Sequence, residues 1–387
     1  MTNVTNLRPV DAPIRPTYGA IRSRYEMWIR NSQNDANRTQ RDITSQVIGA
    51  TVKVDTSADI AWTLDAQIAG LNTVEPYRDW LAPYLVVEWL APDGSLLNVR
   101  RQLGLYMVMP SDSEHTRATS VVTVDGRDPT WLLAQQTVRQ RMTFGYGLDC
   151  GYVARVLFQG HDTQIRLNVP NTGIYTGKVR RIAANEVALP AANEVMQAGG
   201  YWPFAADETG YITTSAAYRL QQVDPRRAVY SSQGDHFDSV QLAPDKTAFK
   251  NQVTLQSVDP DATKALKDGY TARATNPADK YSTVNIGTIG YTISDTSDMS
   301  LDTLKQQAEI LLENRFSQWE QVSLDVVPDP RVTLHECWWL DIRNDQGQTI
   351  QKPGRWRLIS TEFELAANAK VRQTATLGRL ATLQEIP

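Results

Sequence analysis

Alternation of apolar and polar residues with a period of two dominates two separated stretches of this chain. Side chains of a β-strand point alternately to its two faces, so this period indicates strands with one buried face. A Pro-Asp-Gly turn at residues 92–94 lies after one such run, as expected in antiparallel hairpins. The pattern predicts an antiparallel barrel or sandwich. The runs of the first stretch are residues 25–29, 50–55, 60–66, 84–90, 105–109 and 118–124.

The two strand-rich stretches resemble each other. Each contains an apolar strand with one acidic residue, followed by a polar turn that closes on glycine, and similar marks lie at similar spacing on either side. We interpret the match as two related barrels built from the same supersecondary unit. The alternative is that any two hairpins look alike, because strand patterns carry little information. The matched segments are 84–94 with 337–347, 124–127 with 376–379, and 52–55 with 322–325.

Helical patterns separate the two stretches. Asp128 and Pro129 suit the cap and the first position of a helix, and the residues after them place apolar side chains on one helical face. Two more helices are expected at residues 152–158 and 187–196, each followed by glycine. The clearest helix follows Ser300, which can cap it. Its apolar face consists of Leu301, Leu304, Ala308, Leu311 and Leu312, and Leu311→Asp is expected to prevent folding or assembly.

The expected fold class is α+β, mainly β, with two related antiparallel β-barrel domains and a helix-containing insert between them. Two similar barrels in one chain have a geometric use, because three such chains present six barrels and can dock on a six-fold ring. The expected boundaries are 1–20 for an N-terminal arm, 21–127 for the first β-barrel, 128–215 for an α/β insert, 216–319 for a connection of strand, loop and helix, and 320–387 for the closing β-barrel.

The charge balance argues against a dedicated nucleic-acid binder. The chain of 387 residues has 39 Lys and Arg against 43 Asp and Glu, a net charge of −4, whereas such binders usually carry a basic excess. Cys150 and Cys337 are too few for a disulfide framework or a zinc cluster, so we expect two reduced, buried thiols. No apolar run has the length of a signal peptide or a membrane span, so no membrane anchor is expected.

Three short segments contain residue types found in catalytic or metal sites. His335-Glu336-Cys337 comes nearest to a ligand cluster, since His335 and Cys337 would share a face on a strand, but two ligands do not complete a zinc site. His161-Asp162 follows a helix end, which favours a cap or turn over a catalytic dyad. Residues 231–236 supply Ser, Asp and His within one short segment, but a catalytic triad draws its members from separate elements, so a loop is expected.

The remaining candidates point to ordinary surfaces. Gly145-Tyr146-Gly147 lacks the further glycine and the basic residue of a phosphate-binding loop. Arg139-Gln140-Arg141 and Arg180-Arg181 indicate solvated faces or subunit contacts. A pair of catalytic carboxylates leaves no mark in a sequence, so a glycosidase pair stays open. We expect no catalytic, cofactor-binding or metal-binding residue, no cofactor and no enzymatic activity.

Three segments, by their order and spacing, resemble a known family. Residues 124–133 (Val-Asp-Gly-Arg-Asp-Pro-Thr-Trp-Leu-Leu) join a strand to a helix. Residues 190–212 contain a helix, a glycine turn and a hairpin. Residues 308–342 contain the last helix and the Trp338-Trp339 strand of the closing region. Over about residues 25–383 the chain resembles the baseplate hub and tail-tip hub proteins, or minor tail proteins, of long-tailed bacteriophages and contractile injection systems.

The resemblance implies a structural virion protein of the tail tip, made in the cytoplasm of the bacterial host. It implies a homotrimer that closes the tail tube and leaves a channel for DNA during genome ejection. The implied partners are further copies of the chain, the distal tail ring protein, the tape measure protein and the tip or spike protein, while DNA passes only transiently. We expect a channel lining without a basic excess, so that DNA does not stick. Many relatives continue into a lytic or carbohydrate-binding region, and such tasks are expected to fall to other tail proteins.

Three other functions remain open from the sequence. A distal tail ring protein is also built from barrels but is hexameric. A host-surface binding module of the virion would expose aromatic side chains, for which Trp338-Trp339 is a candidate, although core packing is the favoured explanation of that pair. A cell-wall hydrolase would need a carboxylate pair or a zinc site.

Overall fold

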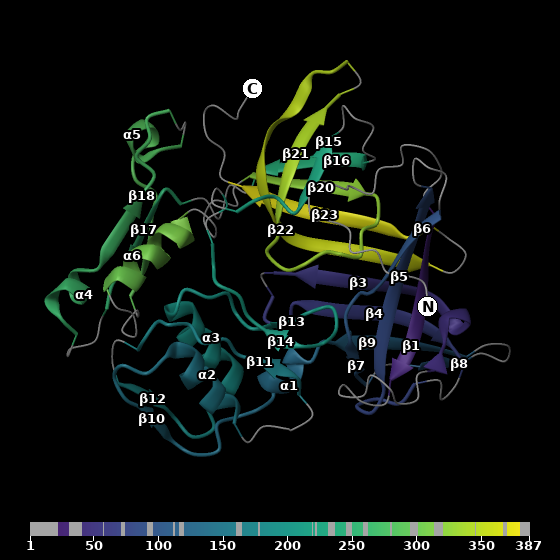
Figure 1. The fold of residues 1–387 in the computed structure, drawn as a ribbon, viewed down its shortest axis with the longest axis horizontal. Helices are drawn as coiled ribbons and strands as arrows, with labels where there is room; N and C mark the ends of the chain where they lie inside the picture. The colour runs from purple at the N-terminus through teal and green to yellow at the C-terminus, as the bar shows by residue number, and fades with distance from the viewer. Residues whose placement is uncertain are drawn as a thin grey trace.

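The computed structural model contains two strand-rich units and two smaller regions that carry the helices (Figure 1). It describes residues 22–30, 41–56, 58–70, 74–90, 96–110, 113–115, 120–159, 165–176, 179–218, 220, 223–230, 237–244, 250–257, 262–278, 281–294, 301–312, 320–344, 346–366 and 370–379. The expected N-terminal arm lies outside these residues.

The N-terminal unit contains the strands that precede residue 128. Its alternation works as the sequence predicts: along β4, Trp62, Leu64, Ala66 and Ile68 are buried, while the residues between them are half-buried or exposed. The elements are β1 (Arg22–Arg30), β2 (Arg41–Asp42), η1 (Thr44–Gln46), β3 (Val47–Asp55), β4 (Trp62–Ala69), β5 (Trp80–Leu90), β6 (Leu96–Gln102), β7 (Tyr106–Val108), β8 (Ser113–His115) and β9 (Ser120–Arg127).

The insert follows with three helices and short strands. The helices lie where the sequence predicts them, although the second begins two residues earlier, at Cys150, with Asp149 as its cap. The apolar sides of these helices meet in a separate core. The elements are α1 (Thr130–Ala134), β10 (Met142–Phe144), α2 (Cys150–Phe158), β11 (Leu167–Asn168), β12 (Arg180–Ile182), α3 (Ala188–Ala198), β13 (Ala205–Ala206) and β14 (Ile212–Thr213). No helix in the described part of the chain is long and apolar enough to cross a membrane.

The C-terminal unit begins earlier than the sequence indicates. Its strands are β15 (Arg227–Tyr230), β16 (Phe237–Pro244), β20 (Glu320–Val326), β21 (Cys337–Arg343), β22 (Thr349–Ala366) and β23 (Arg372–Arg379). β15 and β16 lie within the range expected to be a connection, yet β15 pairs with β21 and β16 pairs with β20. The chain between β16 and β20 therefore interrupts the C-terminal unit.

That interruption folds as an inner subdomain with its own sheet and core. The sequence predicts strands at residues 250–255 and 290–294 with long loops between them; β17 and β19 lie there, and the structure adds β18, giving three strands in the order β18-β17-β19 covered by a helix. Leu304 and Ala308 of that helix and Leu312 just after its end are buried, but Leu311 is only half-buried. The elements are β17 (Gln252–Leu255), α4 (Lys264–Asp268), β18 (Tyr270–Arg273), α5 (Thr283–Ile286), β19 (Gly290–Ile293) and α6 (Leu301–Ile310).

One sheet of 15 strands runs through both units, in the order β16-β20-β23-β22-β3-β4-β9-β7-β5-β1-β2 along its main path. β3 of the N-terminal unit pairs antiparallel with β22 of the C-terminal unit. The α+β, mainly β class is therefore confirmed. The expected closure into two barrels is not found, since the pairing among the described residues forms an open path, and β22 joins β3 across the presumed boundary.

The same strand connectivity occurs in both units. In the N-terminal unit, β3 pairs with β4 and β4 with β9, while the segment of β6, β7 and β8 connects β5 to β9. In the C-terminal unit, β16 pairs with β20 and β20 with β23, while β22 connects β21 to β23. Thus β3, β4, β5 and β9 correspond to β16, β20, β21 and β23, and the long β22 corresponds to β6, β7 and β8 together. One flanking strand differs: β1 runs antiparallel to β5, but β15 runs parallel to β21.

This pairing scheme agrees with two of the three segment matches made from sequence, namely β5 with β21 and β9 with β23. The match of residues 52–55 with 322–325 is wrong by one strand, because β20 corresponds to β4 and not to β3. The sequence match aligned Gly126 with Gly378. In the structure Gly126 pairs with the fully buried Leu64, whereas Gly378 pairs with the half-buried Gln321, so these two glycines are not equivalent positions.

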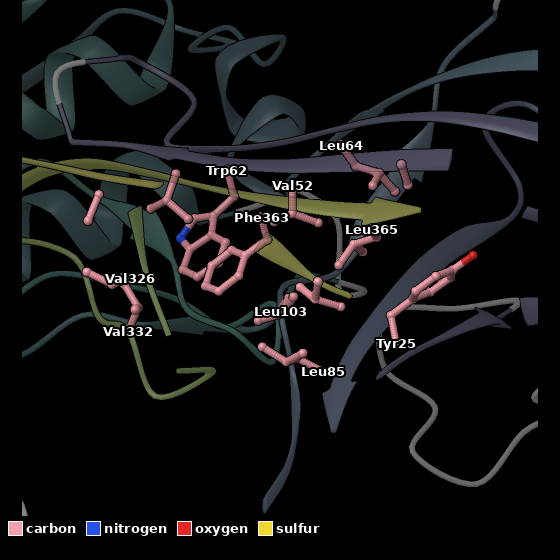
Figure 2. Close-up of a cluster of buried hydrophobic side chains, with 14 of the residues drawn as sticks. Tyr25, Val52, Trp62, Leu64, Leu85, Leu103, Val326, Val332, Phe363 and Leu365 are labelled. Carbon is pink, nitrogen blue, oxygen red and sulfur yellow. The ribbon is translucent and has the colours of Figure 1, made fainter. Parts of the chain in front are cut away.

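The two units share one hydrophobic core. Figure 2 shows Val52 and Trp62 of the N-terminal unit close to Phe363 and Leu365 of the C-terminal unit, all from strands near β3–β22. Each of these side chains is at most 2% exposed. The units are therefore joined by side-chain packing as well as by backbone pairing.

Candidate functional site

The joint between the two units is the first candidate site. Seven residue pairs connect β3 and β22, from Ser360 with Asp55 to Ala366 with Gly49. Just beyond them, the backbone N–H and the hydroxyl of Thr56 both donate to the carbonyl oxygen of Ile359, at 2.9 Å each. This joint fixes the distance and angle between the two related units.

A second joint holds the insert against the C-terminal unit. The His335 ring stacks on the Trp202 indole, with 4.2 Å between ring centroids and 13° between planes. The Arg357 guanidinium lies over the same indole at 5.4 Å, and Tyr218 meets it edge-on at 6.3 Å. Trp202 and Tyr218 come from the end of the insert, and the other two from the C-terminal unit. We call these four residues the aromatic clamp.

His335 occupies a turn and not a strand. Its φ of 58° is in the left-handed region, and β21 begins only at Cys337. The expectation that His335 and Cys337 share a strand face is therefore wrong. Burial, with a further contribution from the positive charge of Arg357, lowers the pKa of His335 to about 3. The imidazole is neutral at physiological pH and serves as a flat stacking surface.

Glu336 and Cys337 are buried beside the clamp. The Glu336 carboxylate accepts hydrogen bonds from the Thr333 backbone N–H at 3.0 Å, the Thr333 hydroxyl at 3.1 Å and the Trp338 indole N–H. Burial raises the pKa of Glu336 and raises that of Cys337 to about 12. A protonated thiol is a poor nucleophile and a poor metal ligand. Across the described residues, no three His, Cys, Asp or Glu side chains come together as a metal site would require.

A buried ion pair secures the loop between β20 and β21. Arg331 Nε donates to Asp329 Oδ1 at 2.8 Å, and the Asp329 backbone N–H donates to Gln373 of β23 at 2.8 Å. Burial alone would raise the pKa of Asp329, but the hydrogen bonds from Arg331 and the charge of Arg227 bring it below its ordinary value. Arg227 of β15 also lies over the Trp338 ring at 4.4 Å. The loop that carries the clamp is thus held from both neighbouring strands.

Asp128 links the N-terminal unit to the insert. One carboxylate oxygen accepts from the Trp62 backbone N–H at 2.9 Å, and the other accepts from the Thr130 N–H at 2.7 Å and from its hydroxyl. The sequence predicts Asp128 as the helix cap and Pro129 as the first helical residue; in the structure Pro129 holds the cap position, α1 starts at Thr130, and the Asp128 carboxylate binds Thr130 from one residue further out. Burial raises the pKa of Asp128 to about 6.

The structure shows where the other candidate residues from the sequence lie and how exposed they are. Both cysteines are buried and neither forms a disulfide. Trp338 is fully buried and Trp339 half-buried, so an exposed aromatic surface at this pair is wrong and core packing is correct. Arg139 and Arg141 are exposed, as expected. His161-Asp162 and residues 231–236 lie outside the described residues.

Two candidates behave differently from the expectation. Arg180 is buried and pairs with Glu194, while its neighbour Arg181 is exposed, so they do not form one basic patch. Gly145-Tyr146-Gly147 follows β10, which pairs with β12, and the Tyr146 side chain is 76% exposed.

Sequence reasoning missed most of the clamp. Trp202, Tyr218 and Arg357 follow no motif, and their partners come from distant segments. The one usable signal was the adjacency of His335, Glu336 and Cys337, which marks a polar interruption before an apolar strand.

Comparisons with known proteins concern the fold. No protein-family model matches the sequence, and no curated protein is similar to it in sequence. Among solved structures, the tail protein from Neisseria meningitidis MC58 superimposes with a TM-score of 0.61 and 13% identity, over 94% of this chain and 100% of that one. The 43 kDa tail protein of prophage MuSo2 from Shewanella oneidensis gives a TM-score of 0.59 and 11% identity, over 92% of this chain and 98% of that one.

The chain has the fold of phage tail proteins. A chain of the PdpA–VgrG complex is similar as well, with a TM-score of 0.54 and 11% identity, over 95% of this chain and 67% of that one. At these identities the likeness concerns the arrangement of the elements, which covers nearly the whole chain and includes both units and the insert.

Proposed function

We propose that this protein is a structural hub subunit of a phage tail tip or baseplate. Three copies form a ring that closes the tail tube and joins it to the tip or spike. The observation that carries the proposal is the repeated strand order of the two units, which stand side by side in one sheet. The shared fold with phage tail proteins supports it.

The proposed mechanism is mechanical. Two like units in each of three chains give six similar units around an axis, which match a six-fold tube on one face and a three-fold spike on the other. The joint between β3 and β22 would set the angle between successive units, and Asp128 and the aromatic clamp would hold the insert in place. A net charge of −4 suits a channel through which DNA passes without sticking.

In this role the protein belongs to the virion tail tip and is made in the bacterial cytoplasm. Its neighbours are other copies of the chain, the distal tail ring protein, the tape measure protein and the tip or spike protein.

The first experiment is the solution mass by light scattering at high protein concentration. A three-fold mass supports the hub. A six-fold mass favours a distal tail ring protein, because six chains would each match one position of a six-fold tube. A strict monomer contradicts a ring that forms without its partners.

A second function, binding to the host surface, is favoured by a group of exposed tyrosines in the insert. Tyr146, Tyr152 and Tyr175 are 76%, 47% and 59% exposed, and all lie near Asp149, which pairs with Tyr175 and caps the helix of Tyr152. Exposed aromatic side chains favour contact with sugars or proteins. Loss of host-cell adsorption in a Tyr146→Ala/Tyr175→Ala virion whose tails assemble normally would support this function over the hub alone.

A further inference from the structure

Arg357 of β22 is a buried cation whose charge no neighbouring carboxylate balances. The residue is only 4% exposed, and in the described part of the chain its guanidinium makes neither a hydrogen bond nor an ion pair. The group it contacts is the face of the Trp202 indole, at 5.4 Å from the ring centroid. Burial lowers the pKa of Arg357 to about 10, because the charged form has lost water without gaining an equivalent partner.

Other buried arginines of this chain do have polar partners. Arg30 donates to Gln102 Oε1 at 3.0 Å, and Arg180 pairs with Glu194. A buried charge without a partner is strongly destabilising, since the interior does not replace its hydration. The fold therefore keeps at position 357 a group that lowers the stability of the isolated chain, and local conflicts of this kind are typical of functional sites.

The aromatic clamp contains a second donor that lacks an acceptor. The Trp202 Nε1–H is buried and has no hydrogen-bond partner within the described residues, although buried polar groups normally have one. Arg357 and Trp202 both offer N–H groups, so the group that would complete them is an acceptor. The positive charge of Arg357 requires that this acceptor be negative.

The clamp is open to such a group and is held in place beforehand. Trp202, Tyr218 and His335 are each half-buried, so the ring cluster beside the buried cation borders solvent. The loop that carries His335 is fixed by the Glu336 carboxylate, which accepts from the backbone N–H and the hydroxyl of Thr333. A site that is already ordered loses little entropy when a ligand binds.

We propose that Arg357 and Trp202 form a binding site for a carboxylate group. The planar guanidinium presents paired N–H donors that match the two oxygens of a carboxylate, and one negative charge balances one cation. A phosphate group carries about 1.5–2 negative charges at pH 7, and its surplus would lie among aromatic rings beside the buried Glu336. The carboxylate comes from a free small acid or from an acidic side chain of another copy. This binding site goes beyond the structural role proposed above.

Urea unfolding of full-length Arg357→Met separates a ligand site from a structural contact. Met keeps an apolar stem and removes the charge, so the urea midpoint of dilute protein in chloride buffer is expected to rise. Arg226→Gln removes an exposed cation that bonds Thr333 in the same loop, and as the matched control it should leave the midpoint unchanged. A lower midpoint for Arg357→Met overturns the proposal, because the guanidinium would then be a structural part of the clamp. An equal rise in Arg226→Gln overturns it too, because net charge would explain both.

Sodium acetate is the probe for the site itself. When it replaces sodium chloride at equal ionic strength, the midpoint of the parent should rise more than that of Arg357→Met, since a ligand that binds only the folded state stabilises it. Effects of the salt on general burial act on both proteins and cancel in this comparison. Arg357→Lys loses the planar fork and Trp202→Phe loses the N–H, so each should show a smaller excess than the parent. Equal shifts in the parent and Arg357→Met overturn the site, and a larger excess with sodium phosphate than with acetate overturns the choice of carboxylate.

Light scattering of the parent and Arg357→Met identifies the source of the carboxylate. If another copy supplies it, the mass of the parent falls when acetate replaces chloride, and Arg357→Met has the lower mass already in chloride. If a free acid supplies it, acetate shifts the midpoint of the parent and the masses stay unchanged. A parent that is monomeric in every buffer but shows the acetate excess keeps the site and contradicts the self-assembling ring. A three-fold mass without the acetate excess overturns the site and leaves the hub standing.

Discussion

Replacing Phe363 by alanine tests whether the two units form one energetic whole. Phe363 is fully buried and pairs with Val52 across the joint, and Figure 2 shows it close to Trp62. A buried phenyl ring removes roughly 150 Å² of apolar surface from water, which at about 25 cal/mol per Å² is worth about 4 kcal/mol. We therefore expect Phe363→Ala to lower the free energy of unfolding by about 3–5 kcal/mol.

Hydrogen exchange measured by mass spectrometry locates that loss, and urea unfolding measures its size. Since the core is shared, exchange should become faster in β3 and β4 as well as in β22 and β23. Glu364→Ala changes the exposed neighbour on the other face of the same strand, and as the matched control it should stay within about 0.5 kcal/mol of the parent. Faster exchange confined to the C-terminal unit would refute the shared core.

Three further perturbations follow from buried groups. Because burial raises the pKa of Asp128 to about 6, against about 3.9 in an unfolded chain, the folded state holds this proton more tightly, so stability falls as pH rises from about 4 to about 6. Urea titrations of Asp128→Asn should lack that fall. Arg331→Met leaves the buried Asp329 carboxylate without its ion-pair partner and should lower the free energy of unfolding by about 3–5 kcal/mol at pH 7. The double variant Asp329→Asn/Arg331→Met should regain part of this loss in urea unfolding. Equal losses in the single and the double variant would contradict the pairing. Leu304→Asp puts a charge at a fully buried position and should abolish exchange protection of β17–β19, whereas Leu311→Asp should retain most of it, contrary to the expectation from sequence alone.

The strands of the two units could be predicted because their alternation is local. β4 shows why: its inward residues are apolar and its outward residues polar, so the period of two appears directly in the sequence. The helices of the insert were equally visible, since glycine and capping residues bound their apolar faces. In the small sheet of β17–β19, the strands β17 and β19 were predicted, but β18 was not, because four residues (Tyr-Thr-Ala-Arg) are too few to show a period.

The joints could not be predicted in the same way. β3 and β22 lie near opposite ends of the chain. The backbone hydrogen-bonding groups of either strand could pair with many other strands, so only tertiary packing selects this pair. The one-strand error in matching residues 52–55 has the same origin, since neighbouring strands of one sheet share a pattern. In the aromatic clamp, Trp202 and His335 carry no local sign that they stack.

Joining two units through a continuous backbone ladder has a consequence for how the molecule bears load. To bend one unit against the other, seven residue pairs between β3 and β22 would have to shear together, along with the side chains packed behind them. The two units therefore move as one rigid body, without a hinge between them. Compliance is left to the parts with separate cores, the insert and the inner subdomain. If tension travels along a tail when the channel opens, the sheet transmits it and the inner subdomain, inserted between β16 and β20, is the part free to yield.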